Sequence, residues 1–202
     1  TKTKKQQYFC KNCNKRFLDF YTYQAYRFGI DNDIVALTKE GTGIRSTATL
    51  LKISPTTLLA RIITIAKNIV QPSIPEGKIY QVDEMRTYVK RKDKLIWIVY
   101  ALEKQTKSVF SFNIGRRTNQ TLKNVITSLE LSEAQKIITD KLKNYKYLIS
   151  EQIHSTKFRG INHIERKNLT LRTHLKRLNR KTICFSKSLV ILDSILRIYF
   201  WG

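Results

Sequence analysis

The sequence predicts an α/β protein in which a mixed sheet flanked by helices follows a small helical domain. Apolar residues recur at helical spacing through residues 33–69, whereas short runs rich in β-branched and aromatic residues begin after residue 78. These later runs give three strands, a helix, a fourth strand and then further helices. Strands that alternate with helices in this way are typical of an α/β domain.

Composition narrows the choice of partner. The chain has 202 residues, enough for one domain of ordinary size plus a small one, and 42% of them are hydrophobic. Its net charge of +23 predicts a polyanionic partner, with nucleic acid as the leading candidate. No apolar run approaches the roughly 20 residues of a membrane span, and no secretory signal is visible. We therefore expect a cytoplasmic protein without a membrane partner.

Residues 1–20 are predicted to form a partial zinc ribbon. Cys10 and Cys13 have the C-x-x-C spacing that lets two thiolates bind one Zn²⁺ ion from a tight turn. A structural zinc site needs four ligands, yet Cys184 is remote in the sequence and no histidine lies near the pair. Zn²⁺ is therefore expected only if a further ligand pair precedes Thr1; the alternative is two free thiols.

Residues 30–70 are predicted to form a helix-turn-helix domain. Its helices are expected at about 33–40, 44–52 and 55–68. Ser54 is a good N-cap and Pro55 suits the first helical position, so a tight turn separates the last two helices. In a helix-turn-helix the N-terminal residues of the second helix face the major groove. The residues expected there are Thr56, Thr57 and Arg61. A plain helical hairpin that only packs is the alternative.

Residues 71–78 hold two of the three prolines and are predicted to link the helical domain to a second domain at 79–202. The strands expected in this second domain lie at 78–85, 94–102, 108–115 and 136–140. A helix capped by Thr118 or Asn119 is expected between the third strand and the fourth.

Two carboxylates close predicted strands. Asp83 ends the apolar run 79–82 of the first strand, and Asp140 ends the apolar run 137–139 of the fourth; each alone has an ordinary structural explanation. A three-stranded meander followed by a crossover helix can place the first and fourth strands side by side and parallel. The two aspartates would then approach each other and repel unless a cation lies between them. Carboxylate oxygens are the ligands that Mg²⁺ prefers, so the pair predicts a magnesium site.

A basic segment at residues 161–188 supplies the third carboxylate. Ile161, Ile164, Leu171, Leu175 and Leu178 form one apolar helical stripe. Glu165 is the single carboxylate among ten Lys or Arg residues between Gln152 and Leu192. It is expected either to complete the metal site or to form an ordinary salt bridge. The cations expected to hold DNA phosphates are Arg166, Arg172, Lys176, Arg177, Arg180 and Lys181.

Three other acids are set aside at this point. Glu84 adjoins Asp83, but alternation along a strand is expected to point it to the opposite face of the sheet. Asp93 lies in the charged turn 90–94 and is expected to be solvated, while Glu133 only precedes the fourth strand.

The three carboxylates and their flanking residues resemble DDE transposases of the insertion-sequence-one family. The motifs that carry the resemblance are Val82-Asp-Glu84, Ile138-Thr-Asp140, Ile164-Glu-Arg-x-Asn-Leu-x-Leu-Arg172, Arg177-Leu-x-Arg-Lys181 and Phe185-Ser-Lys-Ser188. The family also places a zinc ribbon and a helix-turn-helix ahead of its catalytic domain, so the resemblance covers nearly the whole chain. The chain departs from the family in lacking the first cysteine pair and in having Lys141 after the second aspartate.

The resemblance implies an RNase H-like catalytic domain in which Asp83, Asp140 and Glu165 bind Mg²⁺ or Mn²⁺. It implies a two-metal reaction: cleavage at the inverted repeats of a transposon, then strand transfer into target DNA. The implied partners are double-stranded DNA, both transposon ends and target, and further copies of the chain in a homo-oligomer on DNA. Two alternatives stay open at this point: an RNase H-like nuclease or resolvase without strand transfer, and a non-catalytic DNA-binding remnant of a mobile element.

Overall fold

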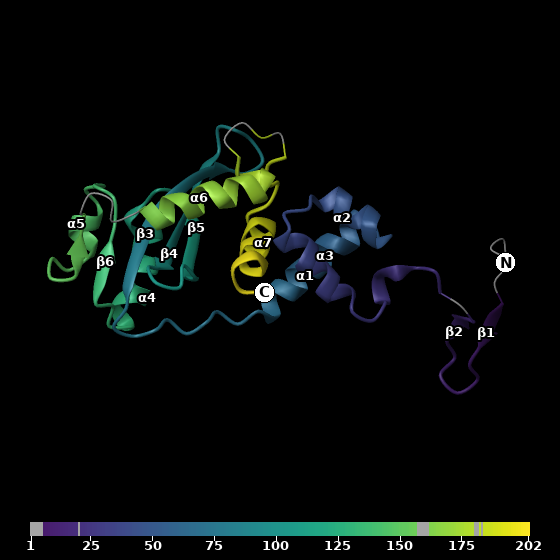
Figure 1. Ribbon diagram of the computed structural model, residues 1–202. Helices are drawn as coiled ribbons and strands as arrows, with labels where there is room; N and C mark the ends of the chain where they lie inside the picture. Colours follow the sequence, from purple (N-terminus) through teal and green to yellow (C-terminus); the bar gives the residue numbers. More distant parts are fainter. Residues whose placement is uncertain (1–5, 20, 157–161, 180–181, 183) are drawn as a thin grey trace.

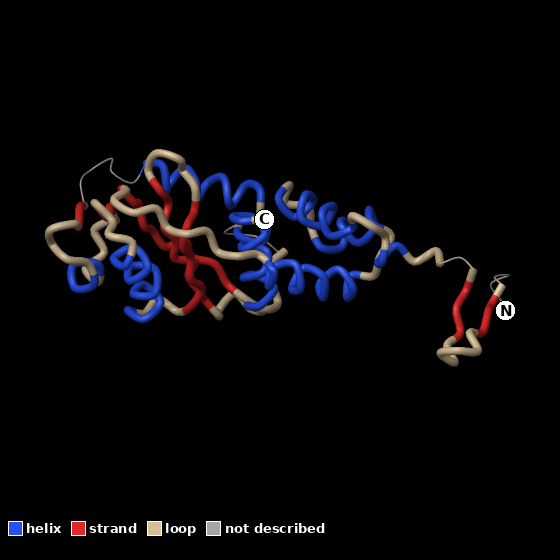
Figure 2. The backbone as a smooth tube through the Cα atoms, turned by 90° about the horizontal axis from the view of Figure 1, so that it is seen from below, coloured by secondary structure: helices blue, strands red, loops and turns tan. Residues whose placement is uncertain are grey.

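The computed structural model describes residues 6–19, 21–156, 162–179, 182 and 184–202 (Figure 1). Seven α-helices and seven strands lie in these ranges. Two strands, β1 (Gln7–Phe9) and β2 (Arg16–Leu18), form a hairpin that stands apart near the N-terminus (Figures 1 and 2). The other five form one sheet, so the chain is a mixed α/β protein, as predicted.

The five-stranded sheet has the order β5-β4-β3-β6-β7. Its strands are β3 (Ile79–Tyr88), β4 (Leu95–Glu103), β5 (Val109–Gly115), β6 (Lys136–Ile138) and β7 (His154–Ser155). β3, β4 and β5 form an antiparallel meander, and β6 lies parallel to β3 on its other side. The predicted pairing of the first and fourth strands of this sheet is thus confirmed. β7, which pairs parallel to β6, was not predicted, because two residues are too short to leave a periodic pattern.

Helices cover both faces of the sheet. On one face, α4 (Asn119–Leu131) and α5 (Tyr145–Leu148) pack on a cluster that includes Tyr80, Val82 and Val99. On the other face, α6 (Asn162–His174) and α7 (Leu189–Trp201) pack on residues that include Met85 and Tyr100. The Thr118 side chain accepts a hydrogen bond from the Thr121 amide and so caps α4, as predicted for this residue.

The basic segment forms a shorter helix than its apolar stripe predicts. α6 ends at His174 and a 3-10 turn, η2 (Lys176–Leu178), follows, yet Leu175 and Leu178 are both buried. A 3-10 turn brings residues three apart onto one face, so the stripe stays buried although the helix has ended. Ile161, the first residue of the predicted stripe, lies outside the described residues.

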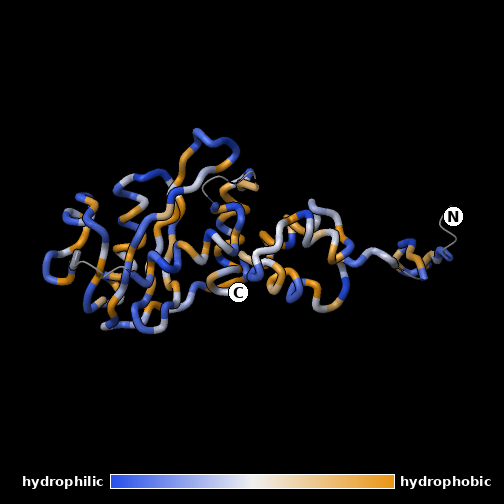
Figure 3. Tube along the Cα trace, turned by 45° about the horizontal axis from the view of Figure 1, so that its top comes forward, coloured by the Kyte–Doolittle hydropathy of each residue, from blue (hydrophilic) through white to orange (hydrophobic). Residues whose placement is uncertain are grey.

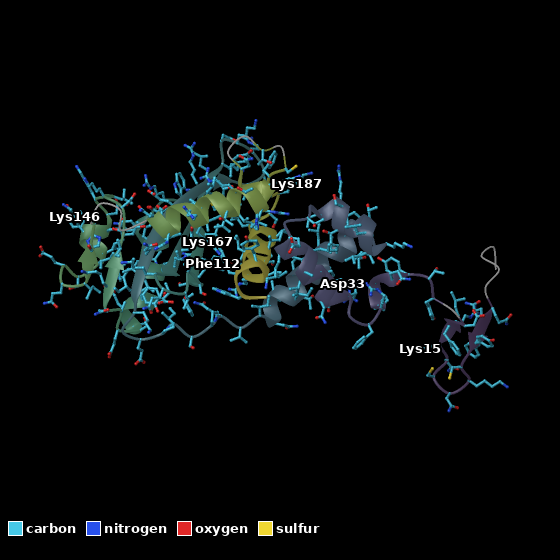
Figure 4. The ribbon with its side chains drawn as sticks, in the orientation of Figure 1. Lys15, Asp33, Phe112, Lys146, Lys167 and Lys187 are labelled. Carbon is cyan, nitrogen blue, oxygen red and sulfur yellow. The ribbon has the colours of Figure 1, made fainter. Side chains whose placement is uncertain are left out.

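Three helices precede the sheet: α1 (Ile30–Lys39), α2 (Ile44–Leu51) and α3 (Pro55–Asn68). Ser54 caps α3 by accepting a hydrogen bond from the Thr57 amide at 3.0 Å. The C-terminal helix α7 lies between these helices and the sheet (Figure 1), and one apolar cluster contains buried residues of all three parts. Phe112 of the sheet, labelled in Figure 4, contacts the rings of Phe200 and Trp201 at centroid distances of 5.6 and 5.0 Å.

None of the described helices is by itself long and apolar enough to cross a membrane; α2 and α3 meet that test only as a pair, bent by 102°. Coloured by hydropathy, the apolar stretches of these helices alternate with polar ones (Figure 3).

Gly41 joins the helical domain to α6. It follows α1 with φ +72°, a left-handed conformation that disfavours residues with a Cβ. A Cβ at this position would lie 2.1 Å from the carbonyl oxygen of His174, the last residue of α6. The helical domain and α6 can therefore meet here only through a glycine.

We predict that Gly41→Ala destabilises the protein by at least about 1–2 kcal/mol, the cost of a left-handed residue with a Cβ, before the clash is added. Gly43→Ala is the matched control, because Gly43 has negative φ and nothing within 4 Å of an added Cβ. Urea unfolding of both variants measures the difference. Equal midpoints would show that the Gly41 contact with His174 does not hold in solution.

Candidate active site

Asp83 and Asp140 meet at the end of the parallel pair β3 and β6. The pairing runs from Ile79 opposite Lys136 to Gln81 opposite Ile138, and the same offset sets Asp83 level with Asp140. β6 ends at Ile138, so β3 has an open edge at this level. The carboxyl ends of parallel strands are where open α/β sheets bind ligands. The structure therefore brings together the two aspartates that the sequence singled out.

Glu84 joins these aspartates, which corrects the expectation that set it aside. Ligand atoms of Asp83, Glu84 and Asp140 all lie within 4.8 Å of one another. Alternation does hold along β3, because Asp83 is opposite Tyr100 on the α6 face and Glu84 is opposite Val99 on the α4 face. Beyond the end of β6, however, carboxyl groups from both faces can reach the same open edge. Alternation fixes the Cα–Cβ direction and not the end of a long side chain.

Burial makes this cluster costly to ionise. Burial is the main cause that raises the pKa of Asp83 to about 6, and the charges of Asp140 and Glu165 add to it. Burial likewise raises the pKa of Glu84 to about 7, with Asp140 adding to the shift and Arg117 opposing it. The Glu84 side chain is 2% exposed, and its Oε1 lies 3.5 Å from Arg117 Nε. Within the described part of the chain, this Oε1 and the neighbouring Tyr145 hydroxyl complete no hydrogen bond.

Asn168 on α6 holds Asp83 in place. Its Nδ2 donates to Asp83 Oδ2 at 2.6 Å, and its Oδ1 accepts from the Tyr100 hydroxyl at 2.8 Å. The Glu84 amide donates to the other Asp83 oxygen at 2.8 Å. Gln81 fixes the start of α6, because its Oε1 accepts a hydrogen bond from the Ile164 amide at 3.0 Å. The orientation of Asp83 thus depends on the sheet and on α6 together.

Glu165 faces the same cleft but lies outside the close group of three carboxylates. It is exposed in the first turn of α6, where the helix dipole favours a negative charge. A cleft of about 970 Å³ runs along α6 beside the carboxylates. Its lining residues are Asp83, Glu84, Glu165, Asn168, Leu169, Arg172, Thr173, Lys176, Asn179, Thr182 and Cys184. Glu165 and Asn168 are three residues apart and so share the helix face that lines the cleft.

Only some of the predicted phosphate-binding cations line the cleft. Arg172 and Lys176 line the cleft, and Arg166 is exposed on α6. Arg177 is half-buried and its Nη1 donates to Ser186 Oγ at 3.1 Å; burial lowers the pKa of its guanidinium. Arg180 and Lys181 lie outside the described residues.

The residues predicted to contact DNA bases differ in whether their side chains already make contacts within the chain. Thr56 is exposed at the start of α3. The Thr57 hydroxyl lies 2.7 Å from the Tyr23 hydroxyl and 2.8 Å from Ser54 Oγ. Arg61 pairs with Asp31 at 2.7 Å. In this conformation, therefore, two of the three predicted side chains make contacts within the chain.

The cysteine pair sits on the turn of the β1–β2 hairpin. The Cys10 amide donates to the Lys15 carbonyl at 2.9 Å, and the pKa of the Cys10 thiol is lowered by hydrogen bonds from the Cys13 backbone, from the Cys13 side chain and from the Asn12 backbone. A lowered thiol pKa favours the thiolate that binds metal. In the described ranges, no third His, Cys, Asp or Glu lies close enough to complete a ligand group with the pair.

The carboxylate cluster fits a divalent cation. Three acceptor groups converge within 4.8 Å, and one of their oxygens, Glu84 Oε1, is buried beside Arg117 but completes no hydrogen bond with the described residues. A cation placed among them would offset the cost of burying their charge and the repulsion between them, which together raise the pKa values of Asp83 and Glu84. An α/β fold whose mixed sheet carries such an acidic centre, beside a cleft lined by cations, fits a metal-dependent enzyme that acts on nucleic acid.

Comparisons with known proteins give this class a family. The model of the family IS1 transposase matches residues 78–201. Insertion element iso-IS1n protein InsB of Shigella dysenteriae is 34% identical over 118 residues, which span 58% of this chain and 90% of that protein. Insertion element IS1 9 protein InsB of Escherichia coli strain K12 is 31% identical over 150 residues, 74% of this chain and 85% of that protein. The chain belongs to the IS1 transposase family, and its function is that of a DNA transposase, a DNA-cleaving enzyme.

Solved structures with a similar course of the chain include two viral ones. The catalytic core domain of HTLV-2 integrase in complex with magnesium (trimeric form) has a TM-score of 0.41 at 15% identity, over 63% of this chain and 86% of that chain. The intasome of simian T-cell lymphotropic virus, in complex with PP2A regulatory subunit B56 gamma, has a TM-score of 0.42 at 16% identity, over 81% of this chain and 66% of that chain.

Sequence reasoning missed Glu84 and Asn168. The sequence did contain a signal for Asn168, because a residue three positions after Glu165 lies on the same face of the helix. No local signal identified Glu84, since the open edge beside β3 exists only because β6 is short. Tyr100 and Tyr145 come from elements distant in the sequence and are placed at the site by the tertiary fold alone.

We predict that the metal-free protein loses stability as the pH rises through about 6 to 7. The pKa values of Asp83 and Glu84 are higher in the folded state than in the unfolded state. The stability that these two groups contribute is therefore fully present below their unfolded pKa values and is lost as the pH rises through their folded pKa values. Added Mg²⁺ should therefore raise Tm more at about pH 7.5 than at about pH 5.5, because protons compete with the cation for the carboxylates.

The control for this prediction is the double variant Asp83→Asn/Glu84→Gln, which cannot titrate at these positions. Thermal unfolding with a chelator should show wild type losing Tm relative to the variant between about pH 5 and about pH 7.5. Parallel curves for the two proteins would contradict the shifted pKa values.

Proposed function

We propose that this transposase uses Asp83, Asp140 and Glu165 as the metal-binding triad of an RNase H-like catalytic domain at residues 79–202. The observation that carries the proposal is the meeting of Asp83 and Asp140 at the open end of β3 and β6, beside a cleft that Glu165 also lines. The meander, the crossover helix α4 and the parallel β6 agree with the order of elements in that fold. The substrate would be double-stranded DNA.

The triad would hold Mg²⁺, or Mn²⁺, with Glu84 at the edge of the site. Two such ions would activate the attacking oxygen and stabilise the leaving oxygen of a phosphodiester. Hydrolysis at the end of the transposon would free a 3′-OH, and that hydroxyl would then attack a strand of the target DNA. No covalent bond to the protein is needed in either step.

The chain's own residues would position the reacting DNA. Asn168 and Tyr100 keep Asp83 in one orientation, so the carboxylate needs little rearrangement during the reaction. Arg172 of α6 and Lys176 of η2 line the same cleft as Glu165 and would neutralise phosphates next to the scissile bond. Arg166 would reach phosphates outside the cleft, and Arg177, Arg180 and Lys181 are proposed contacts beyond it.

The N-terminal part would recognise the transposon ends. We assign DNA reading to a helix-turn-helix at residues 30–70, with Thr56 free and with Thr57 and Arg61 exchanging their partners Tyr23 and Asp31 for DNA. Residues 71–78 would link it to the catalytic domain. Residues 1–20 would act as part of a zinc ribbon if two further ligands join Cys10 and Cys13. Because transposition joins two ends, we propose that copies of the chain assemble on DNA.

We predict that Asp83→Asn, Asp140→Asn and Glu165→Gln each lower strand transfer by at least about 100-fold, the scale of losing a group that stabilises the transition state. The assay follows Mg²⁺-dependent joining of a pre-cut end of the element that encodes the chain. Glu130→Gln is the matched control, because Glu130 is exposed on α4 and the change removes the same charge. Binding of the end duplex should persist in all four variants.

Strand transfer by Glu165→Gln at the wild-type rate would return Glu165 to the role of an ordinary surface carboxylate. Hydrolysis without any joined product from wild type would instead favour a nuclease of the same fold. Binding without either reaction would favour a non-catalytic DNA-binding protein.

We predict a different outcome for Glu84→Gln. The structure offers Glu84 and Glu165 as competing third carboxylates, and we assign the ligand role to Glu165 and a supporting role to Glu84. Removing a supporting group typically lowers metal affinity by about 10–100-fold. Glu84→Gln should therefore recover strand transfer at high Mg²⁺, whereas Glu165→Gln should not recover at any concentration. The reverse pattern in a Mg²⁺ titration would exchange the two roles.

A further inference from the structure

The turn between β3 and β4 carries a concentrated positive charge that belongs neither to the core nor to the carboxylate cluster. We call residues 90–94 the hairpin tip. All five residues are exposed, and four of them are cations: Lys90, Arg91, Lys92 and Lys94. The one acid, Asp93, is paired with Arg91. The tip projects beside the C-terminal end of α6 (Figure 1).

The hairpin tip is fastened to the wall of the cleft. Val89 forms a parallel bridge with Ser186, and the Lys90 amide donates to the Ser186 carbonyl at 2.9 Å. The Tyr88 hydroxyl donates to the Thr182 carbonyl at 2.5 Å, and the Tyr88 ring lies 5.3 Å from the Phe185 ring. Exposed lysines on a turn are usually only solvated, but such a turn needs no attachment of this kind.

The cleft runs from the carboxylates to the segment that holds this tip. Its wall runs along α6 from Glu165 to Arg172, passes Lys176 of η2, and continues to Thr182 and Cys184. Thr182 is the residue whose carbonyl holds Tyr88, just before the tip. A polyanion that enters the cleft at the carboxylates and follows its cations would therefore reach the segment that holds the hairpin tip.

The length of β3 sets the span of that contact. Lys90 is seven residues beyond Asp83, which is about 23 Å along an extended strand. B-form DNA rises about 3.4 Å per base pair, so this span corresponds to about seven base pairs. A tip with four cations matches a phosphate backbone, which is recognised by charge and not by sequence.

We propose that the hairpin tip is a second DNA-binding surface that grips the phosphate backbone of the duplex about seven base pairs from the scissile phosphate. This inference rests on the proposed function for the position of the scissile bond. It adds a contact that holds DNA along the cleft, outside the helix-turn-helix and the residues of α6.

The test compares two triple variants of the full chain. Lys90→Gln/Lys92→Gln/Lys94→Gln removes three charges from the tip and keeps the Arg91–Asp93 pair. Lys78→Gln/Lys104→Gln/Lys107→Gln removes three exposed lysines at the opposite end of β3 and β4, so both variants have the same net charge. Thermal unfolding of both checks that they fold.

Two measurements are made with a chelator present, so that DNA is bound but not cut. A salt titration with a fluorescent duplex of arbitrary sequence should show the log–log slope falling by about 2 to 3 in the tip variant, since each phosphate contact contributes about 0.9. Hydroxyl-radical footprinting on the element's end duplex should show protection lost about seven base pairs from the cleavage position. The control variant should match wild type in both measurements.

An unchanged slope and footprint in the tip variant, or equal losses in the control variant, would overturn the inference. Failure of the proposed function gives a different result: wild type would then show no defined footprint on the end duplex and no strand transfer. In that case the salt slope on the arbitrary duplex still decides whether the tip binds DNA.

Discussion

Three carboxyl groups within 4.8 Å of one another repel when ionised, and much of the fold serves to hold them there. The parallel pairing of β3 with β6 brings Asp83 level with Asp140, and the early end of β6 opens the edge at which they meet. Arg117 offsets part of the charge on Glu84, and a hydrogen bond donated by Asn168 stabilises the ionised form of Asp83. Burial raises the pKa values of Asp83 and Glu84, and the neighbouring carboxylates add to the shift, so a divalent cation among them would favour their ionised forms.

The second constraint is that α6 must lie correctly against the sheet. Its first turn is held by Gln81 and its middle by Tyr100 through Asn168, so the helix face that carries Glu165 is fixed from two strands. Its C-terminal end meets Gly41 of the helical domain so closely that no side chain fits between them. One helix thus joins the carboxylates, the cations of the cleft and the part of the chain that we propose reads DNA.

The C-terminal helix extends this coupling. α7 packs on the helical domain and on the sheet within one apolar cluster, so the two parts share a core although a linker separates them in sequence. A shared core restricts their relative movement more than a flexible linker would. The spacing between a recognised end sequence and the cleavage position would then be set by the protein fold and not by the DNA alone.

The sequence by itself was enough to predict most of the helices and strands and the meeting of the two aspartates. Helical and alternating periodicities placed α2, α3, β3, β4 and β5 to within a few residues, because each pattern is local and long enough to read. Strand order and the shared edge of Asp83 and Asp140 followed from the rule that a crossover connects parallel strands. The family motif around Glu165 also needed only the sequence.

Only the tertiary structure decided how the site is completed. Glu84 entered the cluster because β6 is short, which no pattern around Glu84 reveals. Tyr100, Asn168 and Asp83 meet from two strands and a helix, and the end of α6 at His174 depends on contacts that periodicity does not encode. Which carboxylates converge, and which cations face them, depends on contacts between distant segments, so local sequence patterns specify the parts and packing specifies the site.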